Sequence, residues 1–272
     1  MTDDRQYIPE GARVALRHWL ELLGLFVAVP VAFWWTRANP GQAAAWLGKI
    51  GVTGRLAEMI AGGRLMIPTL LVFALGCLFA LIFDARFENR RLWGFRAGLR
   101  EIPRILAIYV PSVLVLSGMI WLLQPGSALV EEAAAYGIAL PTLDPNASWL
   151  NLPLNRTTLW VAIMFLYPVF SVWPQEVVYR AFFFHRYAPI LRAPVARILV
   201  GAAVFGFMHV VFLNWLAPAM TFVGGLLFCW TYERSRSLFA ATLEHALWGC
   251  YVFTIGIGWY FYGGGVQAWA SP

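Results

Sequence analysis

Four ionisable side chains lie in the apolar second half of the chain, in three separate segments. Glu176 and Arg180 stand four residues apart, a spacing that places both side chains on one face of a helix. His209 and His245 each lie in a later apolar segment. Ionisable groups are costly inside a membrane unless they are paired, so this set indicates a functional site.

The residue types fit the hydrolysis of a carbonyl compound. A carboxylate beside an arginine stays ionised and oriented in a medium of low dielectric constant. We therefore expect Glu176 to take a proton from water, and His209 and His245 to hold that water or to bind the carbonyl oxygen as it gains charge. Arg180 would orient these groups, because a guanidinium does not release its proton. The alternative is a structural ion pair and two hydrogen-bonded interior histidines.

The composition predicts a membrane protein. The chain is 60% hydrophobic and only 12% charged, which is too apolar for a soluble domain of 272 residues. Its apolar runs are continuous rather than alternating, which favours a polytopic α-helical bundle over a barrel. The net charge of +6 comes almost wholly from arginine, and we assign it to cytoplasmic loops rather than to a nucleic-acid partner. The expected partner is the lipid bilayer.

The apolar runs indicate an all-α membrane bundle of about seven transmembrane helices. We place the spans at about 19–35, 65–83, 105–123, 158–173, 198–216, 219–232 and 238–262. The arginine-rich segments 84–104 and 174–197 then predict a cytoplasmic amino terminus and an external carboxyl terminus. We treat residues 1–272 as a single membrane domain in which 158–262 form the core that carries the site.

In their order and spacing, three motifs resemble those of a known family. They are Gln175-Glu176-x-x-x-Arg180, Phe205-x-x-x-His209 and the segment that begins at His245. The CAAX prenyl endopeptidase and bacteriocin-processing membrane proteases (type II CAAX endopeptidases) typically show Glu-Glu-x-x-x-Arg, Phe-x-x-x-His and His-x-x-x-Asn on membrane helices. The resemblance covers about 158–262.

The resemblance implies an intramembrane endopeptidase. Its reaction would be the hydrolysis, by activated water, of a peptide bond in a membrane-associated protein or peptide. The glutamate and the two histidines would activate water and stabilise the oxyanion. The resemblance leaves the cofactor open: either a divalent metal such as zinc takes part, as in a metalloprotease-like enzyme with His209 and His245 as the candidate ligands, or no metal does.

Two departures from the family pattern leave the activity open. Gln175 stands where the family usually has Glu, and a neutral amide cannot act as a general base. Gly249 stands where the family often has Asn, which removes an amide donor. Either Glu176 has taken over as the base, or the chain is an inactive relative that binds a membrane partner, or Gln175 is not the native residue. A transporter with a Glu–Arg–His relay is a further alternative from another class.

Overall fold

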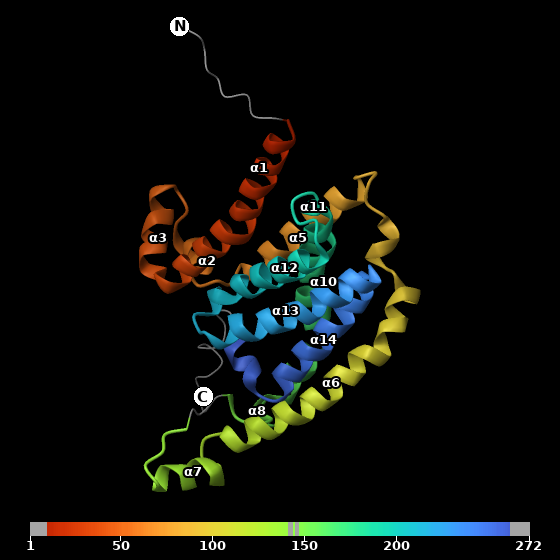
Figure 1. Cartoon of the computed structure of the whole chain (residues 1–272). Helices are drawn as coiled ribbons and strands as arrows, with labels where there is room; N and C mark the ends of the chain where they lie inside the picture. The colour runs from red at the N-terminus through yellow and green to blue at the C-terminus, as the bar shows by residue number, and fades with distance from the viewer. Residues whose placement is uncertain (1–9, 141–143, 145–146, 262–272) are drawn as a thin grey trace.

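The computed structural model describes residues 10–140, 144 and 147–261, and within these ranges every regular element is a helix. This confirms the predicted all-α bundle (Figure 1). The principal helices of the first half are α1 (Glu10–Leu23), α2 (Val29–Ala38), α3 (Pro40–Lys49), α4 (Gly54–Ala61), α5 (Met66–Ile82), α6 (Phe95–Leu123) and α7 (Ala128–Ala135).

The second half contains four long helical stretches. They are the continuous stretch Thr157–Arg186 and the helices α12 (Pro194–Met208), α13 (Leu216–Ser235) and α14 (Leu238–Thr254). The short elements are η2 (Asn89–Leu92), α8 (Asn151–Asn155), η6 (His209–Phe212) and η7 (Ile257–Phe261). Figure 1 shows α12, α13 and α14 side by side, with α6 running along the outside of the bundle.

The helices are long and apolar enough for an integral membrane protein. Four described stretches meet this requirement: Val14–Ala38, Phe95–Leu123, Thr157–Arg186 and Pro194–Phe212. A fifth is added if α4 and α5, which meet at an angle of 79°, count as one broken span. Helices α13 and α14 coincide with the last two predicted spans but fall short of the same requirement. The predicted number of seven spans is therefore not confirmed.

The helix of the predicted fourth span does not end at residue 173 but continues to Arg186. Two prolines, Pro168 and Pro174, lie inside it, and each removes a backbone donor and crowds the preceding turn. The helix accommodates this by widening into π-helical turns at η4 (Pro168–Val172) and η5 (Val177–Phe182). The motif that begins at Gln175 therefore lies within this continuous helix and not beyond its end.

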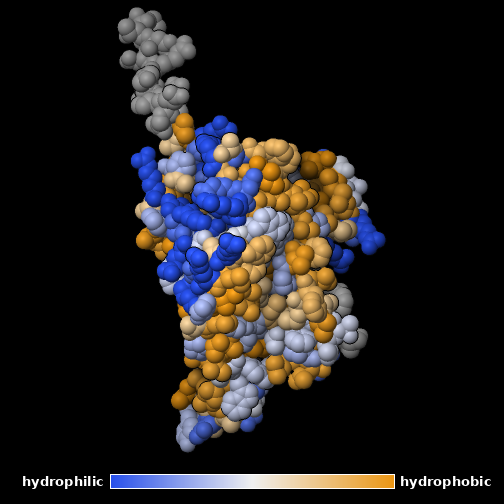
Figure 2. Space-filling view, turned by 90° about the vertical axis from the view of Figure 1, so that its right-hand side faces the viewer, coloured by the Kyte–Doolittle hydropathy of each residue, from blue (hydrophilic) through white to orange (hydrophobic). Residues whose placement is uncertain are grey.

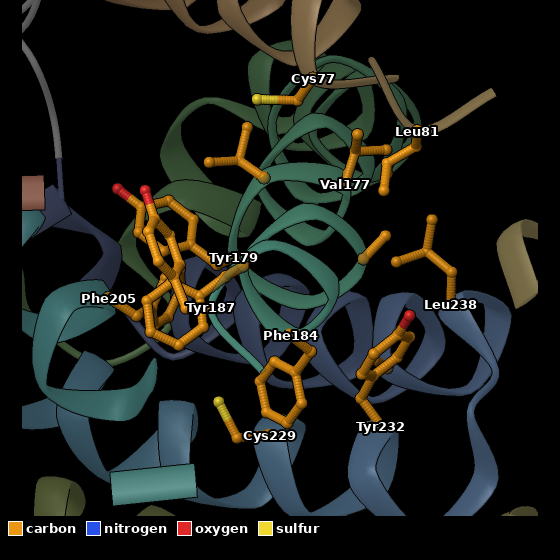
Figure 3. Close-up of a cluster of buried hydrophobic side chains, with 14 of the residues drawn as sticks. Cys77, Leu81, Val177, Tyr179, Phe184, Tyr187, Phe205, Cys229, Tyr232 and Leu238 are labelled. Carbon is orange, nitrogen blue, oxygen red and sulfur yellow. The ribbon is translucent and has the colours of Figure 1, made fainter. Parts of the chain in front are cut away.

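The end of this helix lies in the centre of the hydrophobic core. Val177, Phe184 and Tyr187 are buried there among side chains from α5, α12 and α13 (Figure 3). Two of the three cysteines, Cys77 and Cys229, are buried in the same cluster as free thiols. The site residues on this helix are thus enclosed by packing on several sides.

The basic segments meet at one end of the bundle. His185 lies 2.9 Å from Asp84, and Arg197 of α12 pairs with Glu233 of α13 at 2.7 Å. The Arg86 guanidinium, and then His185, lower the pKa of the Asp84 carboxyl, which favours its ionised form. Figure 2 shows hydrophilic residues gathered toward one end of the face that α6 occupies, next to a broad hydrophobic area.

A second group of connecting segments meets at a different place. Asn214, between α12 and α13, donates a hydrogen bond to the backbone oxygen of Tyr260 at 2.9 Å. Gly256 approaches the backbone of Ser148 so closely that a side chain at position 256 would overlap its oxygen. The predicted alternation of sides and the side that faces the cytoplasm stay predictions, and both chain ends lie outside the described residues.

The ion pair between Arg197 and Glu233 is expected to hold α12 against α13. Arg197 donates two hydrogen bonds to Glu233 and two to backbone oxygens of the loop before α12, and both side chains are only 11% exposed. We expect Arg197→Met to lower the free energy of unfolding by about 2 kcal/mol, because the largely buried Glu233 carboxylate loses one of its two arginine partners and keeps Arg236. Thermal unfolding in detergent measures this. Arg90→Met, which removes an exposed pair with Glu88, is the control and should change little.

Candidate active site

The continuous helix Thr157–Arg186 carries three of the predicted site residues and turns them in different directions. Gln175 points into a cavity, whereas the adjacent Glu176 is completely buried on another side of the helix. Both lie in α10 (Trp173–Glu176), between the two π-helical segments. Such π turns alter the angle between successive side chains and are frequent at functional sites.

Glu176 links two of the other predicted residues. Its Oε1 accepts a hydrogen bond of 2.8 Å from Nδ1 of His245, and its Oε2 lies 3.1 Å from Nε of Arg180. Since Nδ1 carries the proton of this bond, Nε2 is the free nitrogen of the neutral His245 ring and acts as an acceptor. The carboxylate therefore fixes the tautomer and the direction of the imidazole.

The Arg180 side chain is completely buried, and its main contacts are electrostatic. Its contact with Glu176 is an ion pair, and its guanidinium nitrogens have no hydrogen-bond acceptor among the described residues. The guanidinium carbon lies 4.5 Å above the ring of Phe205 and 5.4 Å from that of Phe228. Both rings can stabilise the cation through their π faces. Phe205 of the second motif thus contacts the arginine of the first.

His209 approaches the same place from the end of α12. Its Nδ1–H donates a hydrogen bond of 2.8 Å to the backbone oxygen of Phe205, which leaves Nε2 as an acceptor. The Phe205 ring packs edge-on against both imidazoles, with centroids 4.9 Å from His209 and 5.5 Å from His245. One aromatic ring therefore sets the positions of both histidines.

Gln175, His209 and His245 all line one cavity of about 690 Å³. Apolar side chains from α6, α13 and α14 form most of its wall, including Val115, Leu227 and Val252. The Nε2 of Gln175 donates to the hydroxyl of Ser171 at 2.8 Å, and its Oε1 has no hydrogen-bond partner among the described residues. A free acceptor and two imidazoles thus share one predominantly apolar cavity.

The site contains two polar residues that the motif analysis missed. Ser171 and Tyr167 line the cavity beside Gln175, and the Tyr167 hydroxyl lies 3.3 Å from Nε2 of His245. The three residues are spaced four apart, at 167, 171 and 175, so they follow one face of the helix. This polar row inside an apolar segment was the signal that would have identified them.

Glu244 belongs to a separate network. Its carboxylate accepts a hydrogen bond from Thr231, whose hydroxyl accepts one from Arg104 of α6. Glu244 is buried, but it does not line the cavity. His185 is bonded to Asp84 at the basic end and contributes nothing to the cavity.

The residues around the cavity do not fit a metal centre. In the described part of the chain, no three His, Cys, Asp or Glu side chains gather closely enough to bind one ion. His245 and His209 each use Nδ1 for another bond, so together they offer only two ligand atoms, both Nε2. A protein zinc site normally has three or four protein ligands. The interpretation as metalloprotease-like is therefore not supported.

The charge balance of the site can be tested by its effect on stability. Glu176→Gln keeps the shape of the side chain but leaves the Arg180 cation buried without an anion, and we expect a loss of about 3–5 kcal/mol of unfolding free energy. The double variant Glu176→Gln/Arg180→Met should recover part of this loss, because methionine suits the aromatic surroundings. Thermal unfolding in detergent checks both, with Glu131→Gln on the exposed helix α7 as the control. Additive losses in the double variant would contradict the pairing.

Comparison with known proteins agrees with this geometry. Residues 156–251 match the family model described as "Type II CAAX prenyl endopeptidase Rce1-like", and the match includes every residue discussed above from Tyr167 to Gly249. No curated protein and no solved structure matched the chain. The matched family is a family of proteases. The segment that carries Gln175, His209 and His245 therefore has the sequence pattern of the type II CAAX prenyl endopeptidase Rce1-like family, which confirms the resemblance seen in its three motifs.

Proposed function

We propose that this protein is an intramembrane endopeptidase that hydrolyses a peptide bond of a membrane-associated protein or peptide by activated water. One observation carries the proposal: Gln175, His209 and His245 line a single cavity, and Glu176 is bonded to the far side of the His245 ring. The carboxylate, the imidazole and the cavity thus lie in the order expected when a carboxylate holds a general base in place beside its substrate.

In this mechanism His245 is the base and Glu176 is its positioning residue. The carboxylate holds the proton on Nδ1, so that Nε2 can accept a proton from water as the water oxygen attacks the carbonyl carbon. It also stabilises the imidazolium that then forms, and the same proton later passes to the leaving amine. Glu176 therefore replaces the missing glutamate at position 175 indirectly, because its carboxylate faces His245 rather than the cavity.

Gln175 and His209 would hold the water. The water has two hydrogens: one points to Nε2 of His245, and the other is shared between two acceptors, Oε1 of Gln175 and Nε2 of His209. An amide cannot remove the proton, but it can fix the position of the nucleophile, which is a substantial part of catalysis. The substitution of Gln for Glu is thus compatible with activity in this arrangement.

The wall of the cavity favours a substrate that comes from the membrane. Its apolar residues lie on α6, α13 and α14, and several neighbouring side chains of α6, such as Leu114 and Met119, are exposed on the surface of the bundle. An apolar chain gains free energy when it enters such a cavity, whereas a charged peptide loses hydration there. This supports a membrane-associated peptide rather than a soluble one.

The first test is cleavage by the purified full chain in liposomes. Two quenched fluorescent reporters are used: a prenylated CAAX peptide, and an unprenylated peptide with about 20 consecutive apolar residues. We expect at least one to be cut, and His209→Ala to lower kcat by at least about 100-fold, because the water loses a positioning group. His18→Ala, which removes a histidine far from the cavity, is the matched control. Unchanged cleavage by the His209 variant would contradict the site.

Substitutions at position 175 distinguish an active enzyme from an inactive relative. We expect Gln175→Glu to keep cleavage, since the acceptor oxygen remains, and Gln175→Leu to lower it about 10-fold or more, since a side chain of similar size then offers no acceptor. Initial rates on the reporter that the unmodified chain cuts measure both. A chain that is inert with Gln175 and gains activity with Glu would identify an inactive relative instead.

A further inference from the structure

Position 249 and Tyr167 compete for the same space. Gly249 lies one helical turn after His245 on α14, where the family often has asparagine. A Cβ at position 249 would lie 2.3 Å from both Cε1 and the hydroxyl oxygen of Tyr167, on the neighbouring helix. No side chain fits at such a distance while Tyr167 keeps its place. The glycine therefore makes room for the tyrosine.

The tyrosine brings a polar group to the place that it fills. Its hydroxyl lies 3.3 Å from Nε2 of His245 and lines the cavity together with Gln175. The ring packs edge-on against Phe253 and His245, with centroid distances of 5.2 and 6.3 Å, which restricts its movement. Because Nε2 is an acceptor in this tautomer, the Tyr167 O–H donates to it. The hydroxyl thus stands beside the nitrogen that takes up the proton.

We propose that Tyr167 is a further catalytic residue, whose hydroxyl stabilises the oxyanion in place of a side chain at position 249. The inference rests on the proposed function. In the attack, the water oxygen bonds to the carbonyl carbon, the carbonyl π electrons move to the oxygen, and the water proton goes to Nε2 of His245. Nε2 has one lone pair, so the water hydrogen displaces the Tyr167 O–H from it, and the hydroxyl turns to donate to the carbonyl oxygen that becomes the oxyanion.

The protonation of His245 and the hydrogen bond from Tyr167 to the substrate oxygen then depend on each other. When the proton passes from His245 to the leaving nitrogen, the C–N bond breaks and the carbonyl re-forms, while Nε2 becomes an acceptor again and regains the tyrosine. The hydroxyl is therefore free to bind the substrate oxygen while the water hydrogen, and then the transferred proton, occupies Nε2, and its hydrogen bond strengthens as that oxygen gains charge. An interaction that is stronger in the transition state than in the ground state raises kcat more than substrate affinity.

Two other donors near the cavity are held by bonds that the reaction does not break. The Nε2 of Gln175 donates to Ser171, and Nδ1–H of His209 donates to a backbone oxygen. The Arg180 guanidinium is buried between aromatic rings and does not line the cavity. Among the described residues that line the cavity, Tyr167 donates its hydrogen bond to His245, the proposed base. This favours Tyr167 over Gln175, His209 and Arg180 as the donor to the oxyanion.

The first experiment compares Tyr167→Phe with Tyr109→Phe in full-length protein, with the reporter peptides in liposomes. The phenylalanine keeps the ring packing and removes only the hydroxyl, so we expect kcat to fall by about 100-fold with little change in KM. Tyr109 donates a weak hydrogen bond to Leu247 and lies outside the cavity, so its variant should cleave normally. If Tyr167→Phe cleaves as fast as the unmodified chain, the hydroxyl has no catalytic role and the inference is wrong.

The second experiment moves the donor from one helix to the other. Gly249→Asn alone should be inactive or unfolded, because its side chain overlaps Tyr167. The double variant Tyr167→Ala/Gly249→Asn relieves the overlap and returns an amide donor, so we expect it to cleave at least about 10-fold faster than Tyr167→Ala. Tyr167→Ala/Gly249→Leu is the matched control, since leucine has nearly the shape of asparagine but no donor. Equal rates in the two double variants would overturn the inference, and thermal unfolding shows whether each variant is folded.

The outcomes separate the inference from the proposed function on which it rests. If the unmodified chain cuts neither reporter, the proposed function fails and the inference falls with it. If the chain cuts a reporter and His209→Ala stops the reaction while Tyr167→Phe does not, the proposed function stands and the inference alone fails. If both variants lose kcat, and asparagine at position 249 restores activity to Tyr167→Ala where leucine does not, both are supported.

Discussion

Glu176 and Arg180 place a carboxylate and a guanidinium inside the bundle with no exposed surface on either side chain. Neither charge can be kept there alone, since removing a single ion from water costs several kcal/mol. The structure compensates with contacts from three other places: His245 on α14, Phe205 on α12 and Phe228 on α13. The requirement to neutralise one buried pair thus brings four helical segments together at one point.

Two prolines account for the irregular central helix. A regular α-helix through Pro168 and Pro174 would lose backbone hydrogen bonds, and the π-helical turns take up this distortion. They also separate the directions of Gln175 and Glu176, so that the amide faces the cavity while the carboxylate faces the interior. The helix of 30 residues is about 45 Å long at 1.5 Å per residue, which exceeds the hydrocarbon thickness of about 30 Å.

Much of the fold was predictable because a membrane imposes a simple pattern. Continuous apolar runs identified the helices, and the sequence order of Glu176, His209 and His245 identified the segments that meet. The length of the central helix was not predictable, because proline usually marks a helix end and the π turns that tolerate it have no clear sequence signal. The number of spans also stayed open, because α14 has only 17 residues and the last turns of α13 contain Glu233 and Arg234.

Motifs in the sequence could not predict that a group lost by substitution on one helix is replaced by a side chain from another helix. Taken alone, Gly249 is a lost amide and Gln175 is a lost base, and together they suggest an inactive chain. In three dimensions the glycine admits Tyr167, and the carboxylate next to Gln175 reaches the imidazole from behind. A motif compares residues at fixed positions along one helix, whereas hydrolysis requires only that a base, an acceptor and a donor surround the same atoms. The chemistry of such a site therefore depends on position in space, and the helix that supplies each group can change.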